Sequence, residues 1–438
     1  MTIEIARTRW LGAARVLGGW LLLGALVGCL CGGASALFLH ALEIVTRFRE
    51  AHERIVFALP LAGLFVGAIY ARWGRSVRAG NNLVIDTLHE GGPPVPLRMA
   101  PMVLAGTVIT HLFGGSAGRE GTAVQMGASL ADQLALRLGL APDLRRQLLV
   151  AGIAGGFGSV FGTPIAGLIF GMEVVVIGRI EYSALAPALV ASLVGDLVTR
   201  ALGVVHTVYP RVAPFALGPV VVGKWLLVGV AAGCVAIAFI ELTHGLKKLA
   251  ERRVPSLPLR MLLGGIAVVA AWQIVGTNRY LGLGVPTIVA AFSDPSVPAY
   301  AFALKLGFTS LTLAAGFLGG EVTPLFFVGA TLGAALGRLL GLPIDLAAGV
   351  GLAAVFGAAA NTPLALAVMA VELLGAAVLP HVLIVTVVAY LASGHRGIYP
   401  SQRIARGKLG RALPGEMSLR DLEGPRTNDE KKTTSSAA

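Results

Sequence analysis

Charged residues are scarce in this chain of 438 residues. Asp, Glu, Lys and Arg make up 13% of it, against roughly 25% in soluble proteins. Hydrophobic residues make up 55%, and the mean hydropathy is +0.79. Uncharged runs such as 16–42 and 148–172 exceed the ~20 residues that cross a bilayer. This composition excludes an ordinary soluble domain and predicts an all-α polytopic membrane protein in contact with the lipid bilayer.

Cysteine is almost absent as well. Cys29, Cys31 and Cys234 all lie in apolar runs, so they predict neither a disulfide framework nor a metal site. The eight histidines show no metal-ligand spacing. We therefore expect no metal, no cofactor and no catalytic residue, and we do not expect an enzyme. The N-terminal apolar stretch is too long for a signal-peptide core and predicts a retained first helix.

The net charge is +12, yet the basic residues gather at the edges of apolar spans and not on one nucleic-acid-binding face. Such clusters mark cytoplasmic loops. We therefore expect both termini in the cytoplasm and the chain in the inner (plasma) membrane, with no nucleic acid partner. The polar tail 415–438 is expected to be disordered. The basic clusters are Arg7, Arg9 and Arg15; Arg72, Arg75 and Arg78; Lys247, Lys248, Arg252 and Arg253; and Arg403, Arg406, Lys408 and Arg411.

The chain carries an internal repeat. At an offset of 202 residues, Gly127-Ala128 falls on Gly329-Ala330. At an offset of 199, eight of the 22 positions from 152 to 173 are identical. They include Glu173 and Glu372, for which we expect structural roles. Homologous halves with interrupted, charged segments are typical of secondary transporters whose site lies between the repeats. The predicted parts are a cytoplasmic N-terminal segment (1–15), a first transmembrane repeat (16–202), a second (203–402) and a cytoplasmic basic and polar tail (403–438), partly disordered.

The apolar pattern predicts long helices separated by polar breaks. Shorter pieces at 82–90, 285–293 and 400–408 cannot span a bilayer alone, so we expect half-helices or re-entrant segments covered by protein or water. The predicted fold is therefore an inverted repeat of tilted, broken and half-length helices. The longer helices are expected at 12–46, 55–72, 99–113, 122–138, 144–160, 163–178, 183–202, 217–250, 259–276, 299–317, 323–340, 344–358, 362–376 and 380–393.

Polar, glycine-rich segments precede three of the apolar helices. They are Gly80-Asn81-Asn82, the segment from Gly118 to Thr122, and the segment from Gly319 to Pro324. The free N–H groups and positive dipole end of such a helix start bind anions. Three such starts in one membrane protein predict that the substrate is an anion.

Two carboxylates lie in these segments. A glutamate at membrane depth is costly and indicates function, so we assign gating and proton coupling to Glu120 and Glu321. We do not expect a structural ion pair between Glu120 and Arg119, because adjacent residues on a helix do not face each other. The alternatives are that Glu321 is a buried structural acid and that Asn81 and Asn82 are simple N-caps.

Over residues 12 to 408 the chain resembles the CLC family of anion channels and proton-coupled antiporters. The segment from Gly118 to Thr122 is similar to the family's gating-glutamate motif. Gly80-Asn81-Asn82-Leu83 together with Glu321 resembles the fluoride-exporting branch, whereas most of the family has serine and glycine at the asparagines. The resemblance implies exchange of fluoride for protons by a homodimer with one pore per subunit. It also implies an anion site formed by Gly80, Asn81, Asn82, Gly118, Arg119, Gly121, Thr122, Gly320, Val322, Thr323 and Tyr399.

Several positions depart from the usual family pattern. Thr122 stands where proline is usual. Chloride/proton antiporters of the family usually carry two consecutive glutamates, of which the second relays protons inward; here Val174 follows Glu173. That relay is missing, so Glu321 is expected to share the coupling.

The alternatives to fluoride/proton exchange are a chloride/proton antiporter and a passive anion channel of the same family. Tyr399 is expected to close the anion site from inside. The alternative is that Tyr399 belongs to the belt of aromatic residues at the membrane–water interface.

The charges predict a mechanism. A carboxylate and a halide carry the same charge and compete for the same helix starts. Ionised Glu120 blocks the anion site, whereas protonated Glu120 withdraws and admits the anion. Two neighbouring acids do not ionise equally, which helps one of them hold a proton. Fluoride is the strongest hydrogen-bond acceptor among the halides, so asparagine amides and backbone N–H groups suit it.

One motif points to a different class. Gly114-Gly115-Ser116-Ala117-Gly118 fits the G-x-S-x-G pattern of serine hydrolases. A serine nucleophile needs a general base, and no histidine is singled out as one: we expect His40, His111 and His381 to serve packing or helix ends. A hydrolase also leaves the repeat unexplained, so transport is the better interpretation.

Overall fold

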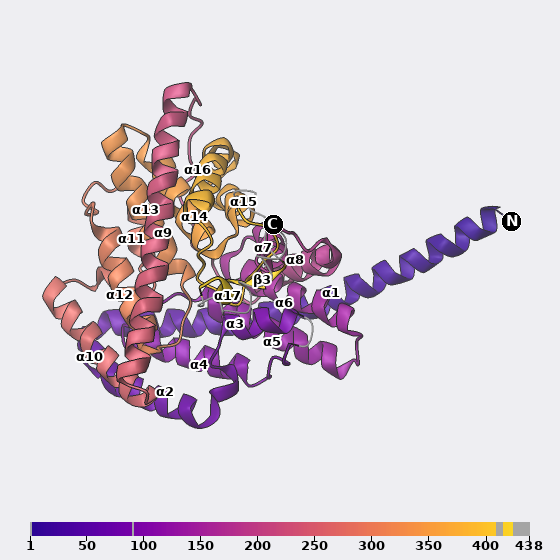
Figure 1. The fold of residues 1–438 in the computed structure, drawn as a ribbon, viewed down its shortest axis with the longest axis horizontal. Helices are drawn as coiled ribbons and strands as arrows, with labels where there is room; N and C mark the ends of the chain where they lie inside the picture. The colour runs from indigo at the N-terminus through magenta and orange to yellow at the C-terminus, as the bar shows by residue number, and fades with distance from the viewer. Residues whose placement is uncertain (1, 90–91, 409–414, 424–438) are drawn as a thin grey trace, which may run out of the picture.

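The computed structural model describes residues 2–89, 92–408 and 415–423, and helices dominate it (Figure 1). Each long helix predicted from the sequence has a counterpart, so the all-α expectation is confirmed apart from three two-residue strands. The helices are α1 Thr2–Ala51, α2 Leu59–Trp73, α3 Asn81–Leu88, α4 Met99–Leu112, α5 Glu120–Arg137, α6 Pro142–Phe161, α7 Pro164–Glu173, α8 Leu185–Ala201, α9 Pro219–Arg253, α10 Leu257–Val275, α11 Val285–Ala290, α12 Ala301–Ala315, α13 Val322–Leu340, α14 Ile344–Ala360, α15 Pro363–Leu374, α16 Leu379–Ala392 and α17 Leu419–Glu423. The strands are β1 Val176–Ile177, β2 Arg403–Ile404 and β3 Met417–Ser418.

Helices α1–α8 and α9–α16 follow each other in matching order. The sequence offset of 202 carries the starts of α4 and α5 onto those of α12 and α13. In Figure 1 the first half, indigo to magenta, occupies the lower and right part, and the second half, pink to yellow, rises at the upper left. The two halves meet where α2 packs on α10, α7 on α15 and α5 on α13. The repeat seen in the sequence is therefore a repeat of helices.

Symmetric contacts join the halves. Gly118 and Gly320, which are 202 residues apart, exchange two backbone hydrogen bonds of 2.6 and 2.8 Å. Glu173, at the end of α7, accepts hydrogen bonds from the first N–H groups of α15, and Glu372 on α15 accepts bonds from Ile165 and Ala166 at the start of α7. A carboxylate at a helix start is favoured by the free donors and the dipole. These bonds support the structural roles expected for both glutamates.

Within the core, α5 packs closely on α6, and α13 on α14, through small residues. Every residue from Leu148 to Phe161 is buried, as is every residue from Leu346 to Ala360. A methyl group on Gly127 would collide with the carbonyl oxygen of Gly152, and one on Gly329 would collide with that of Gly351. Such close backbone approach is typical of helix packing within membranes. It gives the rigid frame on which the two facing helix starts are held.

Two predicted helical segments differ in the structure. The segment 400–408 is not helical, because β2 there pairs with β1 in parallel and with β3 in antiparallel orientation. The helix predicted at 163–178 ends at Glu173 and is followed by four β-branched residues, Val174 to Ile177, of which the last two form β1. Branched side chains favour the extended conformation. Both errors come from this small sheet, which joins segments distant in sequence.

The predicted disorder of the tail 415–438 is wrong for its first part. Residues 417–423 form β3 and α17, and Leu419, only 2% exposed, packs against Ile177 and Ile404. The apolar side chains of this short stretch suffice to dock it on the sheet. Residues 424–438, the rest of the predicted tail, lie outside the described residues.

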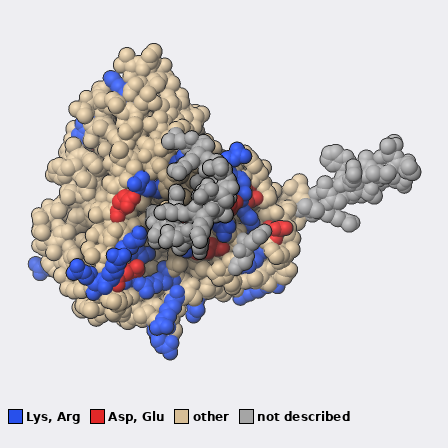
Figure 2. Space-filling model, in the orientation of Figure 1, with Lys and Arg blue, Asp and Glu red and all other residues tan. Residues whose placement is uncertain are grey.

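The surface fits a bilayer. Six helices within the described ranges are long and apolar enough to cross a membrane, and large apolar side chains on α1, α2, α9 and α10 are exposed. Figure 2 shows charged side chains gathered on the lower part of one face around the C-terminal segment, whereas the upper part carries few. The chain is therefore an integral membrane protein, and the basic side is the one expected in the cytoplasm.

Candidate functional site

The starts of α5 and α13 face each other across the Gly118–Gly320 hydrogen bonds. Arg119 is the N-cap of α5, and Glu321 is the N-cap of α13. A Cβ on Gly118 would lie 2.9 Å from the carbonyl oxygen of Gly320 and 3.0 Å from Glu120 Oε2. No side chain fits between these helix starts, which explains the glycines of both motifs.

Glu120 is the first residue of α5 and is completely buried. Its Oε1 accepts a hydrogen bond of 2.5 Å from the Thr323 hydroxyl, and its Oε2 accepts one of 3.1 Å from the Thr323 N–H. Thr323 lies in the first turn of α13. The carboxylate of the first repeat therefore caps the helix start of the second repeat, where free N–H groups and the helix dipole favour a negative charge.

Arg119 also holds this carboxylate. Its backbone N–H lies 3.1 Å from Glu120 Oε2, and its Nε lies 3.3 Å from Oε1. The expectation that these neighbours do not pair was wrong, because Arg119 is the N-cap and precedes the helix, where the spacing rule for helix faces does not apply. Two donors from each repeat thus converge on Glu120.

Asn81 and Glu321 approach Gly121 from two other elements. A Cβ on Gly121 would lie 3.0 Å from Asn81 Nδ2 and 3.9 Å from Glu321 Oε2. Asn81 Oδ1 and Glu321 Oε2 are buried and have no hydrogen-bond partner among the described residues. Buried polar atoms normally have partners, so these two point to a ligand, a water or a proton. The free oxygen argues against the alternative that Glu321 is a fully bonded structural acid.

At the start of α3, the donor available to a ligand is a side chain, because backbone N–H groups there are already used. Gly80 is its N-cap with a φ of +58°, a conformation that favours glycine. The N–H groups of Asn82 and Leu83 already donate to the carbonyls of Ala79 and Gly80. The amide oxygen of Asn82 accepts a bond of 3.0 Å from the Ser401 N–H. Of the two asparagines, Asn82 anchors the loop after Tyr399, and Asn81 has its amide at the Gly121 position.

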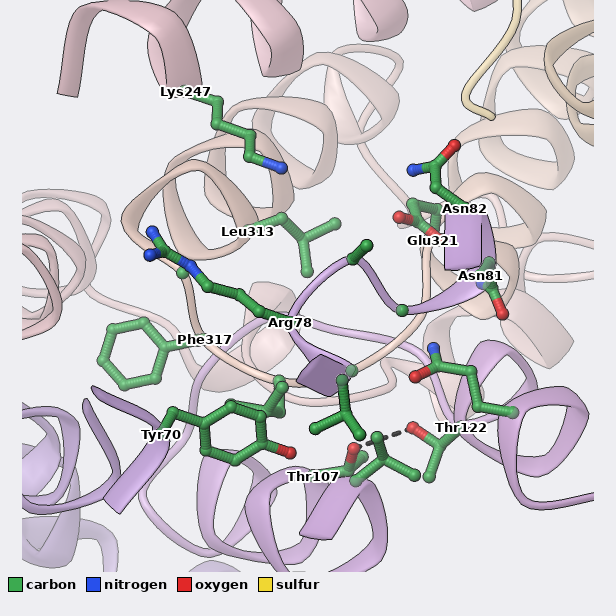
Figure 3. Close-up of a pocket in the computed structure, with 18 of the residues that line it drawn as sticks. Tyr70, Arg78, Asn81, Asn82, Thr107, Thr122, Lys247, Leu313, Phe317 and Glu321 are labelled. Atoms are coloured by element: carbon green, nitrogen blue, oxygen red, sulfur yellow. Dashed lines mark hydrogen bonds between the residues drawn. The ribbon is translucent and has the colours of Figure 1, made fainter. Parts of the chain in front are cut away.

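Thr122 and Val322 complete the predicted set. The Thr122 hydroxyl forms a 2.7 Å hydrogen bond with Thr107, drawn as a dashed line in Figure 3. Val322 is buried in the first turn of α13. In the repeat, Val322 is the residue equivalent to Glu120, so only the first repeat carries a glutamate at this position.

Two buried tyrosines lie close enough to Glu120 to interact with it electrostatically. Tyr399, buried in the loop after α16, lines a pocket with Glu321, and both glutamates act on it electrostatically. Tyr209, in the linker between the halves, is acted on by Arg119 and Glu120. Tyr209 was missed by the sequence analysis, because an aromatic residue in an irregular linker gives no periodic signal.

A pocket of about 170 Å³ leads to Asn81 and Glu321 (Figure 3). It also contains residues that sequence reasoning did not select. Gln125 lies one turn beyond Gly121 on the same face of α5, with its amide 3.4 to 3.6 Å from a Cβ built on Gly80. The available signal was a polar residue four positions after Gly121, on the same helix face. Besides Glu321, its charged residues are Arg78 and Lys247, which were noted only as markers of membrane orientation, and Glu251 and Arg260, which were not noted.

The serine-hydrolase interpretation has no support in the geometry. The Ser116 hydroxyl pairs with the Thr309 hydroxyl at 2.9 Å. Both ring nitrogens of His111 lie at backbone carbonyls, those of Thr107 and Ala117. Ser116 therefore has a threonine partner where a hydrolase needs a general base, and His111 serves packing as expected.

Sequence comparisons identify the family of the chain. The family model for voltage gated chloride channels matches residues 62–394. A chloride/fluoride channel protein of Pseudomonas syringae pv. tomato is 48% identical over 412 residues, which cover 92% of this chain and 90% of that protein. An H⁺/Cl⁻ exchange transporter of Cronobacter sakazakii is 27% identical over 341 residues, 72% of each chain.

Solved structures share the fold. A CLC-type fluoride/proton antiporter superposes with a TM-score of 0.86 at 38% identity, covering 89% of this chain and 98% of that one. A slow cyanobacterial Cl⁻/H⁺ antiporter superposes with a TM-score of 0.75 at 18% identity, covering 85% and 94% of the two chains, and supports the fold alone. With a family model over most of its length and close relatives of matching length, the chain belongs to the voltage gated chloride channel family, the CLC family.

Proposed function

We propose that this protein is a secondary active transporter that exports fluoride in exchange for protons across the inner membrane. The names of two relatives support the substrate: one is a chloride/fluoride channel protein and the other a fluoride/proton antiporter. The proposal includes a homodimer with both termini in the cytoplasm, in line with the basic loops. The activity proposed is transport and not catalysis.

The observation that carries the proposal is the position of the Glu120 carboxylate. It occupies the start of α13 and accepts two hydrogen bonds from Thr323. A halide would seek the same donors, because both ligands are anions and each bond to an anion is worth about 1.5–3 kcal/mol. Anion and ionised Glu120 therefore exclude each other. Protonation removes the charge that holds the side chain there, so anion entry and proton uptake are linked at one residue.

Asn81 and Glu321 extend the site toward the pocket. Asn81 Nδ2 is a neutral donor suited to a small, strongly hydrated halide, and Glu321 Oε2 is an unpaired acceptor beside it. In the proposed cycle, Glu321 holds a proton or tunes the charge next to the bound anion. Arg119 and Thr323 receive Glu120 when it returns, which resets the closed arrangement.

The test is fluoride movement in proteoliposomes under an imposed pH gradient, with potassium and valinomycin clamping the membrane potential. One pH unit supplies about 1.4 kcal/mol per proton, enough for a tenfold fluoride gradient at one-for-one exchange. The direction is diagnostic. Passive permeation of hydrogen fluoride accumulates fluoride on the alkaline side, whereas antiport accumulates it on the acidic side. Fluoride that only reaches electrochemical equilibrium would refute the proposal and favour a passive channel.

A chloride/proton antiporter is the other candidate, since the names of two relatives include chloride. The same vesicles loaded with chloride distinguish the two. We expect fluoride to be pumped and chloride to move much more slowly. Equal pumping of both ions would contradict the proposed selectivity without contradicting proton coupling.

A further inference from the structure

The pocket has a basic arm, formed by Arg78, Lys247 and Arg260. Arg78 precedes the start of α3, Lys247 lies near the end of α9, and Arg260 lies in the first turn of α10. Figure 3 shows the Arg78 and Lys247 side chains on the left, opposite Asn81 and Glu321 on the right. The cations therefore lie on the way to the proposed anion site and not at it.

Arg260 is the buried member of this arm. Its side chain is 4% exposed, and its Nε has no hydrogen-bond partner among the described residues. One long contact of 3.4 Å, from Nη1 to the Val254 carbonyl, is the hydrogen bond found for its guanidinium. A guanidinium offers five N–H donors and stays charged. A buried cation with unused donors is costly, so Arg260 points to an anion or a hydrated anion beside it.

Glu251 lies between two members of the arm. Its Oε1 is 3.6 Å from Arg260 Nη2 and 3.7 Å from Arg78 Nη2. Both distances exceed the 2.7–3.2 Å of a good hydrogen bond, so attraction between charges holds the carboxylate loosely. The Glu251 side chain is also 41% exposed. One carboxylate oxygen thus rests where two guanidinium groups converge, and it is free to swing away.

From these contacts we infer that Arg78, Lys247 and Arg260 form a second anion subsite, an entry subsite, for which Glu251 competes. The inference rests on the proposed function, because it takes fluoride as the anion. A hydrated fluoride ion displaces Glu251 Oε1 from the guanidinium groups, accepts the free Arg260 donors and then moves along the pocket to Asn81. The pocket volume of about 170 Å³ holds several waters, so the ion keeps part of its hydration shell there. Field focusing in such a cleft raises the local anion concentration.

The experiment compares variants of opposite charge in the full-length protein. Initial rates of fluoride efflux from proteoliposomes are measured against fluoride concentration at low and at high ionic strength, using a large impermeant salt. The variants are Arg260→Gln, Arg78→Gln and Glu251→Gln, with Arg260→Lys as a conservative replacement. Arg252→Gln is the matched control, because Arg252 is exposed near Glu251 and does not line the pocket.

We expect Arg260→Gln and Arg78→Gln to raise the KM for fluoride by about twofold to fivefold, the size of a single-charge effect in a partly hydrated cleft. Glu251→Gln should lower the KM by a similar factor. Arg260→Lys keeps the charge, so its KM should lie close to that of the wild type. The rates at saturating fluoride should change little in all variants. High ionic strength should shrink these differences. Arg252→Gln should match the wild type. Elution of each variant in gel filtration checks folding, and Arg78→Gln, at an exposed position, keeps the test valid if Arg260→Gln does not fold.

Unchanged KM values in both Arg78→Gln and Glu251→Gln would overturn the inference. So would a KM shift in Arg252→Gln equal to that in Arg78→Gln, since it would assign the effect to general surface charge. Failure of the proposed function is distinguishable from these outcomes: in that case the wild-type protein itself does not drive fluoride toward the acidic side.

Discussion

Replacement of Glu120 by glutamine tests the central step of the proposed cycle. The glutamine keeps the size of the side chain and removes its charge. In the structure, Thr323 donates two hydrogen bonds to the carboxylate, of 2.5 and 3.1 Å. Glutamine offers one acceptor oxygen, and its amide group faces a donor at the second position. The side chain therefore loses most of its hold on the start of α13.

The size of the loss follows from these contacts. Bonds to a charged acceptor contribute about 1.5–3 kcal/mol each, and neutral ones about 0.5–1.5 kcal/mol. Weakening both Thr323 bonds favours the withdrawn side chain by about 2–3 kcal/mol, which is roughly 30- to 150-fold in occupancy. The variant also has no carboxylate to carry a proton. We expect proton-driven fluoride transport to be lost and the remaining fluoride flux to be independent of the pH gradient.

The assay follows fluoride with a selective electrode and protons with a trapped dye in the same vesicles. Glu43→Gln is the matched control, because Glu43 is an exposed glutamate that pairs with Arg47 one turn away. It should pump like the wild type. If Glu120→Gln still accumulates fluoride on the acidic side at the wild-type rate, then Glu120 does not couple the two fluxes and its contacts with α13 are structural.

Four further substitutions test other parts of the site. Asn81→Ser removes the amide beside Gly121 and should lower the fluoride-to-chloride flux ratio; an unchanged ratio would contradict direct contact. Gly121→Ala places a methyl group 3.0 Å from Asn81 Nδ2 and should abolish transport, whereas Gly223→Ala, with open space around it, should not. Glu321→Ala should abolish proton-driven transport while Val174→Ala preserves it, as simultaneous proton and fluoride fluxes would show; persistence of the original exchange ratio in Glu321→Ala would make the acid structural. Glu372→Ala removes the acceptor of two N–H groups at the start of α7 and should lower stability by about 2–4 kcal/mol, seen as a reduced melting temperature in detergent.

The fold was predictable because the signals for membrane helices are strong. Long uncharged runs predict spans, and the offset between the halves predicts a repeat. The structure adds that the offset pairs Gly118 with Gly320 directly, a contact that no single segment reveals. The small sheet was not predicted, since strands of two residues are too short to show a period and their partners lie far apart in the chain.

The sequence drew attention to residues that the fold brings together, but it did not reveal their contacts. Glycines and carboxylates inside apolar sequence were conspicuous, and Glu120, Glu321 and Asn81 do approach the same pair of helix starts. The pairing of Arg119 with Glu120 was missed because the sequence does not say on which side of a helix start a residue lies. Arg78 and Arg260 were noted only as edge charges or not at all, since their convergence on one carboxylate depends on how α9 and α10 pack.

The repeat also gives a structural reason why the proposed movement falls to one glutamate while two others stay fixed. Glu173 and Glu372 are related by the repeat, and each caps a helix of the other half, so neither is released without freeing the backbone donors of a helix start. At the α5 and α13 starts this reciprocity is broken, because the position equivalent to Glu120 is Val322. The start of α13 receives a carboxylate from the other repeat, but the start of α5 receives none in return. The proposed mechanism uses this asymmetry, because it leaves one helix start that an anion and the Glu120 side chain would occupy in turn.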